Sequence, residues 1–96
     1  MQNLSIEVAT EVGALIAELH DAGWIVSAYR YDAAIMGNWY VELDRANHRI
    51  RLVKNRSQYM IQGSQVEKMK TAGLWRAFDN LEEFRQSVRK FTTESN

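Results

Sequence analysis

Residues 39–44 alternate strictly between two kinds of side chain, and this alternation limits the possible folds of the chain more than any other feature. The segment reads Trp-Tyr-Val-Glu-Leu-Asp, so one face of an extended strand carries only Trp, Val and Leu, and the other carries both acids. A one-residue slip in pairing would bring those acids into the core, which specifies the register strongly. The pattern predicts a half-buried β-strand.

Residues 49–54 complement this strand. A hairpin over Arg45–His48 puts the aliphatic pairs on one face and the pairs of opposite charge on the other. The predicted pairs are Asp44 with Arg49, Leu43 with Ile50, Glu42 with Arg51, Val41 with Leu52, and Tyr40 with Val53. The basic residues of this region therefore read as a solvated sheet face with paired charges, in which only Lys54 and Arg56 lack a partner.

Residues 24–31 and 58–62 extend the hairpin to four strands. A two-residue turn at Asn55-Arg56 would join the third and fourth strands. The further predicted pairs are Leu52 with Tyr59, Ile50 with Ile61, Ala28 with Val41, and Val26 with Leu43. In this register the side chains of the first strand that point away from the core are those of Ile25, Ser27, Tyr29 and Tyr31.

Apolar residues at helical spacing predict helices at about residues 4–22 and from residue 81 onward. The capping-box pattern Ser-Gln-Val-Glu at residues 64–67 predicts a short helix over residues 64–72. The predicted helix-end residues are Asn3 or Ser5, Gly23, Ser64, Gly73 and Asp79. Residues 74–78 read as a short strand, which gives the order α-β-β-β-β-α-β-α. The predicted fold is a two-layer α+β domain: an antiparallel four-stranded meander plus one short strand, with the helices on one face.

The chain length and composition favour one domain over residues 1–96, with residues 92–96 as a frayed tail. There is no cysteine, and 12 basic residues balance 12 acidic ones, which is not typical of a nucleic-acid-binding domain. No apolar run approaches the roughly 20 residues of a membrane span, and the N-terminus does not resemble a secretory signal. We expect a cytoplasmic protein without membrane contact.

The predicted register leaves several large side chains on the sheet face that the helices cannot cover. Exposed apolar patches that combine Tyr, Met and Arg are typical of protein interfaces. We therefore expect a partner-binding or self-association site on this face. The predicted site residues are Tyr29, Tyr31, Tyr40, Glu42, Arg51, Val53 and Met60.

The resulting functional hypothesis is a small non-enzymatic protein-binding module, which by analogy of size and composition fits inhibitor or immunity-type proteins. One alternative is nucleic-acid binding, with bases stacking on the tyrosines. Its residues would be Tyr29, Tyr31, Tyr40, Arg49, Arg51, Lys54 and Arg56. The other alternative is a small enzyme, for which the chain offers no catalytic triad, phosphate-binding loop or cofactor motif. His20 and His48 lack a second ligand at metal-binding spacing, so we expect neither metal nor cofactor.

Overall fold

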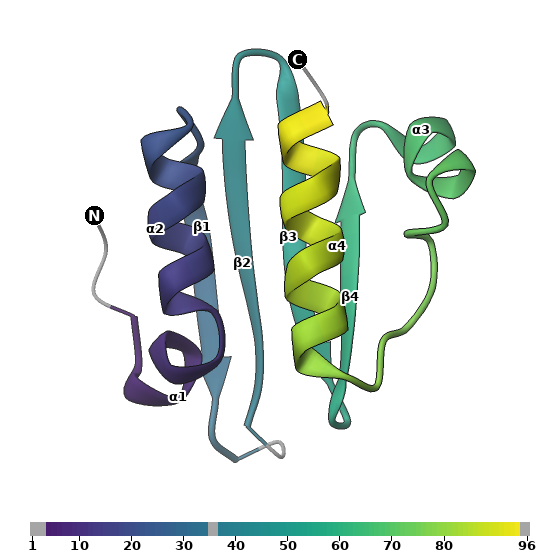
Figure 1. Ribbon diagram of the computed structural model, residues 1–96. Helices are drawn as coiled ribbons and strands as arrows, with labels where there is room; N and C mark the ends of the chain where they lie inside the picture. Colours follow the sequence, from purple (N-terminus) through teal and green to yellow (C-terminus); the bar gives the residue numbers. More distant parts are fainter. Residues whose placement is uncertain (1–3, 35–36, 95–96) are drawn as a thin grey trace.

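Four antiparallel strands follow one another across a single sheet in the order β1-β2-β3-β4 (Figure 1). The computed structural model describes residues 4–34 and 37–94. The strands are β1 (Ile25–Asp32), β2 (Asn38–Arg45), β3 (His48–Asn55) and β4 (Gln58–Gly63). The helical elements are α1 (Ile6–Val8), the π-helical segment η1 (Ala9–Gly13), α2 (Ala14–Asp21), α3 (Val66–Thr71) and α4 (Leu81–Glu94). Both long helices, α2 and α4, lie on the same face of the sheet, which confirms the predicted α+β meander.

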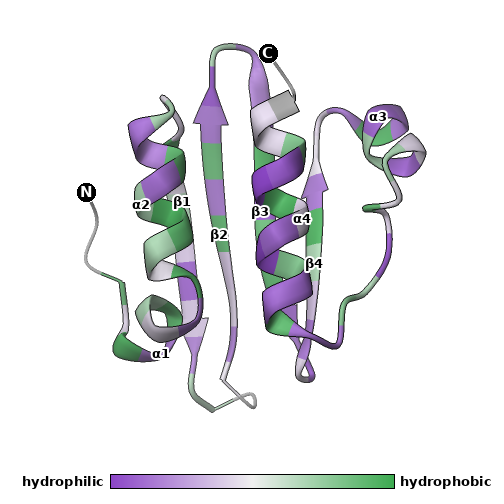
Figure 2. Ribbon diagram, in the orientation of Figure 1, coloured by the Kyte–Doolittle hydropathy of each residue, from purple (hydrophilic) through white to green (hydrophobic). Residues whose placement is uncertain are grey.

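The core lies between the sheet and the helices. Figure 2 shows the alternation along β2 as successive green and purple bands. The buried members of the sheet are Trp39, Val41, Leu43, Ile50, Leu52, Tyr59 and Ile61, with Val26 half-buried beside them and the buried Trp24 just before β1. The helices contribute Val8, Val12, Leu15, Ile16, Leu19, Met69, Phe84, Val88 and Phe91. The predicted inner face of the sheet is therefore confirmed.

The first helix forms close to its predicted limits but is not uniformly α-helical. Ser5 caps it, because the Ser5 hydroxyl accepts a hydrogen bond from the Val8 amide at 3.3 Å. Asn3, the other predicted cap, lies outside the described residues. Gly23 ends the helix with φ at +98°, as expected for a glycine after a C-cap. The apolar stripe of this helix does not indicate that Ala9–Gly13 is π-helical.

The hairpin register between β2 and β3 is as predicted, including Glu42 opposite Arg51 and Asp44 opposite Arg49. The register between β3 and β4 was predicted wrongly by two residues, since Leu52 pairs with Ile61. The turn is Arg56-Ser57, whose φ values of 53° and 65° are those of the mirror-image turn that suits the strand twist. A shift of two residues preserves the faces, so the core assignment survived this error.

The register of β1 was predicted wrongly beyond Val26. A β-bulge between Val26 and Ala28 inserts one extra residue, so that Tyr29 pairs with Val41 and Tyr31 with Trp39. Both tyrosines consequently lie on the helix side of the sheet and pack against the core. The Tyr29 hydroxyl also accepts a hydrogen bond from the Ser5 amide at 2.8 Å. Arg30, rather than the tyrosines, is on the outer face.

Residues 74–78 do not form the predicted strand. Only Phe78 pairs with the sheet, through an isolated bridge to Tyr59. The Arg76 amide instead donates to the Leu74 carbonyl at 2.9 Å, which turns the chain away from β4.

Two of the predicted helix caps are also wrong. The Ser64 hydroxyl accepts from the Arg49 amide and leaves α3 without a side-chain cap. Asn80, not Asp79, caps α4, because its side-chain oxygen accepts from the Glu83 amide at 2.8 Å. Asp79 accepts instead from the Gln58 amide group.

The predicted tail begins too early. The helix α4 continues to Glu94, and Thr92 is buried, with its hydroxyl donating to the Val88 carbonyl at 2.9 Å. Residues 95–96 lie outside the described residues.

Replacing Asn80 with alanine is expected to lower the free energy of unfolding by about 0.5–2 kcal/mol, because the Glu83 amide loses its acceptor. Asp79→Ala is the matched control, and its exposed side chain should contribute less than about 0.5 kcal/mol. Urea denaturation of both variants measures the difference. A larger loss for the Asp79 variant would contradict the assignment of the cap.

Candidate functional site

A single row of cross-strand neighbours crosses the outer face of the sheet, the face opposite the helices. Arg30 pairs with Tyr40, Tyr40 with Val53, and Val53 with Met60, so each of the four strands contributes one member. We call these four residues the transverse row. Tyr40, Val53 and Met60 are half-buried although no helix covers them, since each is shielded by its neighbours along the sheet.

Polar side chains flank the transverse row on both sides. The neighbouring row toward the β1–β2 connection consists of Asp32, Asn38, Asn55 and Gln58. The row on the other side consists of the polar Glu42, Arg51 and Gln62, with the small apolar Ala28 at its β1 end. Tyr40, Val53 and Met60 thus form an apolar strip with Arg30 at its β1 end and polar side chains along its margins, an arrangement that resembles the core and rim of a protein interface.

The ring of Tyr40 is held in place by Arg51. The Arg51 guanidinium lies 4.6 Å from the ring centre, and its Nε donates to the Glu42 carboxylate at 3.0 Å. Because one guanidinium contacts both the ring and the carboxylate, these contacts fix the orientation of the Tyr40 ring.

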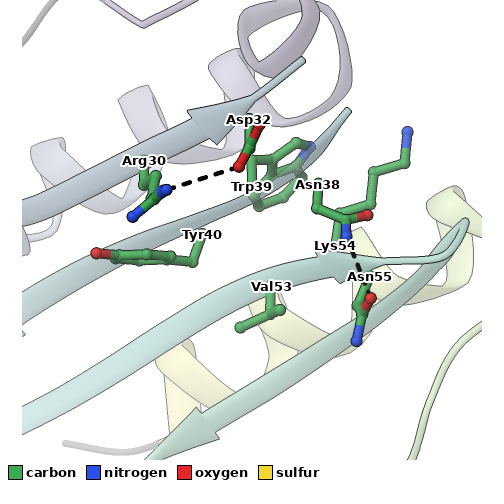
Figure 3. Close-up of a pocket in the computed structure, with 8 residues that line it drawn as sticks. All are labelled: Arg30, Asp32, Asn38, Trp39, Tyr40, Val53, Lys54 and Asn55. Carbon is green, nitrogen blue, oxygen red and sulfur yellow. Dashed lines mark hydrogen bonds and ion pairs between the residues drawn. The ribbon is translucent and has the colours of Figure 1, made fainter. Parts of the chain in front are cut away.

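A hollow of about 330 Å³ opens at one end of the outer face (Figure 3). Arg30, Tyr40 and Val53 line it from the transverse row, and Asp32, Asn38 and Asn55 line it from the polar margin. The Asn38 side chain donates to the Asn55 side chain at 3.3 Å and joins β2 to β3 at the rim. The hollow combines an apolar floor with amides at its edge.

The arginines of the outer face are each paired with a carboxylate. Arg30 lies 3.6 Å from Asp32, and Arg51 is bound to Glu42. The Arg49 Nε donates to Asp44 at 2.8 Å, and this hydrogen bond lowers the pKa of the Asp44 carboxyl. The charge pairing predicted from the hairpin register is confirmed, and the face carries no excess of positive charge.

Two predicted site residues are not part of this surface, because the bulge in β1 turns Tyr29 and Tyr31 to the helix side. Tyr40, Glu42, Arg51, Val53 and Met60 are brought together on the outer face, as the register required. Arg30 was missed as a member of this face. The sequence does not indicate the bulge, because Tyr29, Arg30 and Tyr31 alternate between the two faces of the sheet whether or not an extra residue is inserted before them.

A second polar cluster, on the inner side of the sheet, was not predicted. The Glu11 carboxylate accepts hydrogen bonds from Trp39 Nε1 at 3.1 Å, from Lys54 Nζ at 3.0 Å and from the Tyr59 hydroxyl. Glu11 lies in the π-helical segment η1, and its carbonyl accepts from Arg85 of α4 at 2.9 Å. Lys54 was predicted to be unpaired, but its side chain points inward and donates to the carboxylate of Glu11, which lies 43 positions earlier in the chain.

The hydrogen bonds of this cluster shift two pKa values. Burial of Glu11 raises its pKa, but the hydrogen bonds from Tyr59, Trp39 and Lys54 outweigh burial and hold it below the usual value. Burial and the adjacent Glu11 carboxylate both raise the pKa of the Tyr59 hydroxyl. The cluster therefore holds an ionised carboxylate and a neutral tyrosine, and it ties η1 to three strands.

Among residues 4–34 and 37–94, no three potential ligand side chains of His, Asp or Glu come together as a metal site. No helix in that same part of the chain is long and apolar enough to cross a membrane. No protein-family model matches the chain, and neither curated proteins nor solved structures yield a match.

Proposed function

We propose that this protein is a small non-enzymatic protein-binding module, and that its partner protein docks on the outer face of the sheet. The observation that carries the proposal is the transverse row, in which Tyr40, Val53 and Met60 form an apolar strip that ends at Arg30 and that no element of the described chain covers. A partner would bury Tyr40, Val53 and Met60 while the paired charges of the margin stayed at the rim.

The preset orientation of Tyr40 supports this proposal. Side chains that contribute most to protein interfaces are often Tyr and Arg in well-packed surroundings. The contact between Tyr40 and Arg51 joins these two types, and Glu42 neutralises the guanidinium. A partner would therefore meet a rigid aromatic anchor without having to desolvate an unpaired charge.

Nucleic-acid binding is less well supported. Binding to phosphates requires arginines and lysines that are free to displace counterions. Arg30, Arg49 and Arg51 are paired with carboxylates on the outer face, and Lys54 is bound to Glu11 on the inner one. Of the three tyrosines proposed to stack on bases, only Tyr40 faces outward.

Within this proposal the protein acts in the cytoplasm, a location with which the absence of cysteine is consistent. An inhibitor or immunity-type role would require one specific partner and no catalytic residues. That role rests on analogy of size and composition alone.

The test is the double substitution Tyr40→Ala with Val53→Ala. Because both side chains belong to the docking surface and neither to the core, the variant should stay folded and lose at least about tenfold in affinity for the partner. Ile6→Ala is the control, since Ile6 is 78% exposed on α1, away from the outer face. Partners would be captured from the native source and identified by mass spectrometry. Calorimetry would then measure their affinity for the unchanged protein, the double variant and the Ile6→Ala variant.

Three outcomes separate the hypotheses. Equal affinity of the double variant and the unchanged protein would overturn the proposed site. If the unchanged protein sediments as a dimer and the double variant as a monomer, the partner is a second copy of the chain. Nucleic-acid binding that falls steeply with added salt would favour the alternative function.

A further inference from the structure

The free edge of β4 begins a second ladder of hydrogen bonds that stops after one pair of residues. The Tyr59 amide donates to the Phe78 carbonyl at 2.8 Å, and the Phe78 amide donates back to Tyr59 at 2.7 Å. This is the closed pair of an antiparallel sheet. It shows that the backbone polar groups of Tyr59 point away from β3 and toward residues 74–78.

In an antiparallel ladder every second residue points to the same edge, so the groups of Ile61 also point away from β3. Continuing the register of Tyr59 with Phe78 would pair Ile61 with Arg76. That pair does not form, because the Arg76 amide donates to the Leu74 carbonyl instead. Within the described residues, the edge-facing amide and carbonyl of Ile61 have no hydrogen-bond partner.

Two contacts hold Arg76 away from the edge. Its guanidinium lies 3.8 Å from the centre of the Phe78 ring and forms an ion pair with Glu83 at the start of α4. Figure 1 shows the connection between α3 and α4 running beside β4. On the other side of the missing pair, the Leu74 amide donates to the Met69 carbonyl at 2.9 Å, so the chain's own segment is held on both sides without completing the ladder.

A hollow of about 200 Å³ lies at this point of the edge. It is lined by Met60, Ile61, Gln62, Trp75, Arg76 and Ala77. Trp75 is 46% exposed, which is unusual for so large an apolar side chain, and it forms one wall. The volume exceeds that of a single water, which takes up about 30 Å³ in the liquid.

We propose that the edge of β4 at Ile61 binds an extended peptide segment of a partner protein. One residue of such a segment supplies both an acceptor for the Ile61 amide and a donor to its carbonyl, which is the requirement of strand addition. An apolar side chain next to that residue would fill the hollow between Met60 and Trp75. The interior of a helix cannot satisfy both groups, because its backbone donors and acceptors are already paired, and each helix end leaves free only donors or only acceptors.

This inference goes beyond the outer-face site and does not depend on it. Met60 borders both surfaces, but the edge site requires neither Tyr40 nor Val53. The two proposals can therefore fail separately.

The first test is amide hydrogen exchange of the free protein, followed by NMR. The Tyr59 amide is paired and should exchange slowly, whereas the Ile61 amide should exchange at least about a hundredfold faster although it lies within the same strand. Equal protection of the two amides would overturn the proposal, since it would mean that residues 74–77 close the ladder themselves.

The second test uses a defined probe, the acetylated and amidated peptide Thr-Val-Thr-Val-Thr. Binding should slow the exchange of the Ile61 amide and shift the resonances of Trp75. In one further peptide the valine amides are N-methylated, and in another the threonine amides; these two sets of amides point to opposite edges of an extended chain. The methylated peptide whose blocked amides face Ile61 should lose at least about tenfold in affinity, and the other less than about threefold. Equal binding of both methylated peptides, or no effect on Ile61, would overturn the proposal.

Variants complete the test. Trp75→Ala removes an exposed wall of the hollow and should weaken peptide binding by at least about fivefold, while the fold is retained. Ile6→Ala again serves as the control and should bind the peptide normally. Weakening by both variants to the same extent would indicate non-specific hydrophobic binding and would contradict the edge site.

Discussion

Replacing Leu43 with alanine is expected to lower the free energy of unfolding by about 2–5 kcal/mol. Leu43 is fully buried at the centre of β2, between Val26 of β1 and Ile50 of β3, and beneath the helical layer. The substitution removes three carbon atoms from a site enclosed on all sides, so the loss combines the transfer free energy of those atoms with the cost of a cavity. Urea denaturation, followed by tryptophan fluorescence, measures it through the midpoint at an unchanged slope.

The control for this prediction is Ile25→Ala. Ile25 lies in the neighbouring strand but is 63% exposed, so its truncation should change the stability by less than about 0.5 kcal/mol. A comparable loss in both variants would show that the outer face is covered, and a negligible loss for Leu43→Ala would show that the faces are reversed.

The substitution Glu11→Ala is expected to lower the free energy of unfolding by about 2–4 kcal/mol, because it leaves three hydrogen-bond donors without their acceptor. The donors come from Trp39, Lys54 and Tyr59, and the Glu11 side chain is only 17% exposed. Glu18→Ala, in the adjoining helix α2, is the matched control. Its side chain pairs with Arg89 at the surface and should contribute at most about 1 kcal/mol.

The stability conferred by Glu11 should depend on pH in a defined direction. Its pKa in the folded protein lies below the ordinary value of 4.5. The folded state therefore favours the ionised form, so this contribution is fully present above the unfolded pKa and is lost as the pH falls through the folded pKa. Acid unfolding of Glu11→Ala should accordingly depend less on pH below about 4.5 than that of the unchanged protein. Parallel pH profiles for the two proteins would contradict the role of this carboxylate.

Short-range patterns were sufficient to predict most of the fold. The alternation along β2 and the matched charges of β3 determined both the hairpin register and the inner face of the sheet. The apolar stripes of the first and last helices correctly placed both helices on that face. Even the misjudged turn before β4 left the face assignment intact, because its error was an even number of residues.

The outer-face site could be predicted only as far as each side chain was assigned to the right face. Tyr40 and Val53 were placed on it by the correct register of the β2–β3 hairpin. Met60 was placed on it because a register error of two residues leaves the faces unchanged. Tyr29 and Tyr31 were misplaced by the single extra residue of the bulge in β1. A tyrosine is compatible with either face, since its ring packs in a core and its hydroxyl accepts a hydrogen bond there, as Tyr29 does from Ser5.

Most of the helices and strands follow from the amino-acid pattern, apart from residues 74–78 and the π-helical turn. The pairing of β2 with β3 and the division into an inner and an outer face follow from it too, because they depend on neighbours within a few residues or across one tight turn. The bulge in β1, the turn of Arg76 away from β4 and the contact of Glu11 with Lys54 were evident only once the chain was folded. The cluster around Glu11 shows the reason, because its members are far apart in the chain: Lys54 lies 43 positions from Glu11, and Tyr59 lies 48 positions from it. Local periodicity carries no information about such distances, since a carboxylate on a helix and a lysine on a strand become partners only after the two layers have packed.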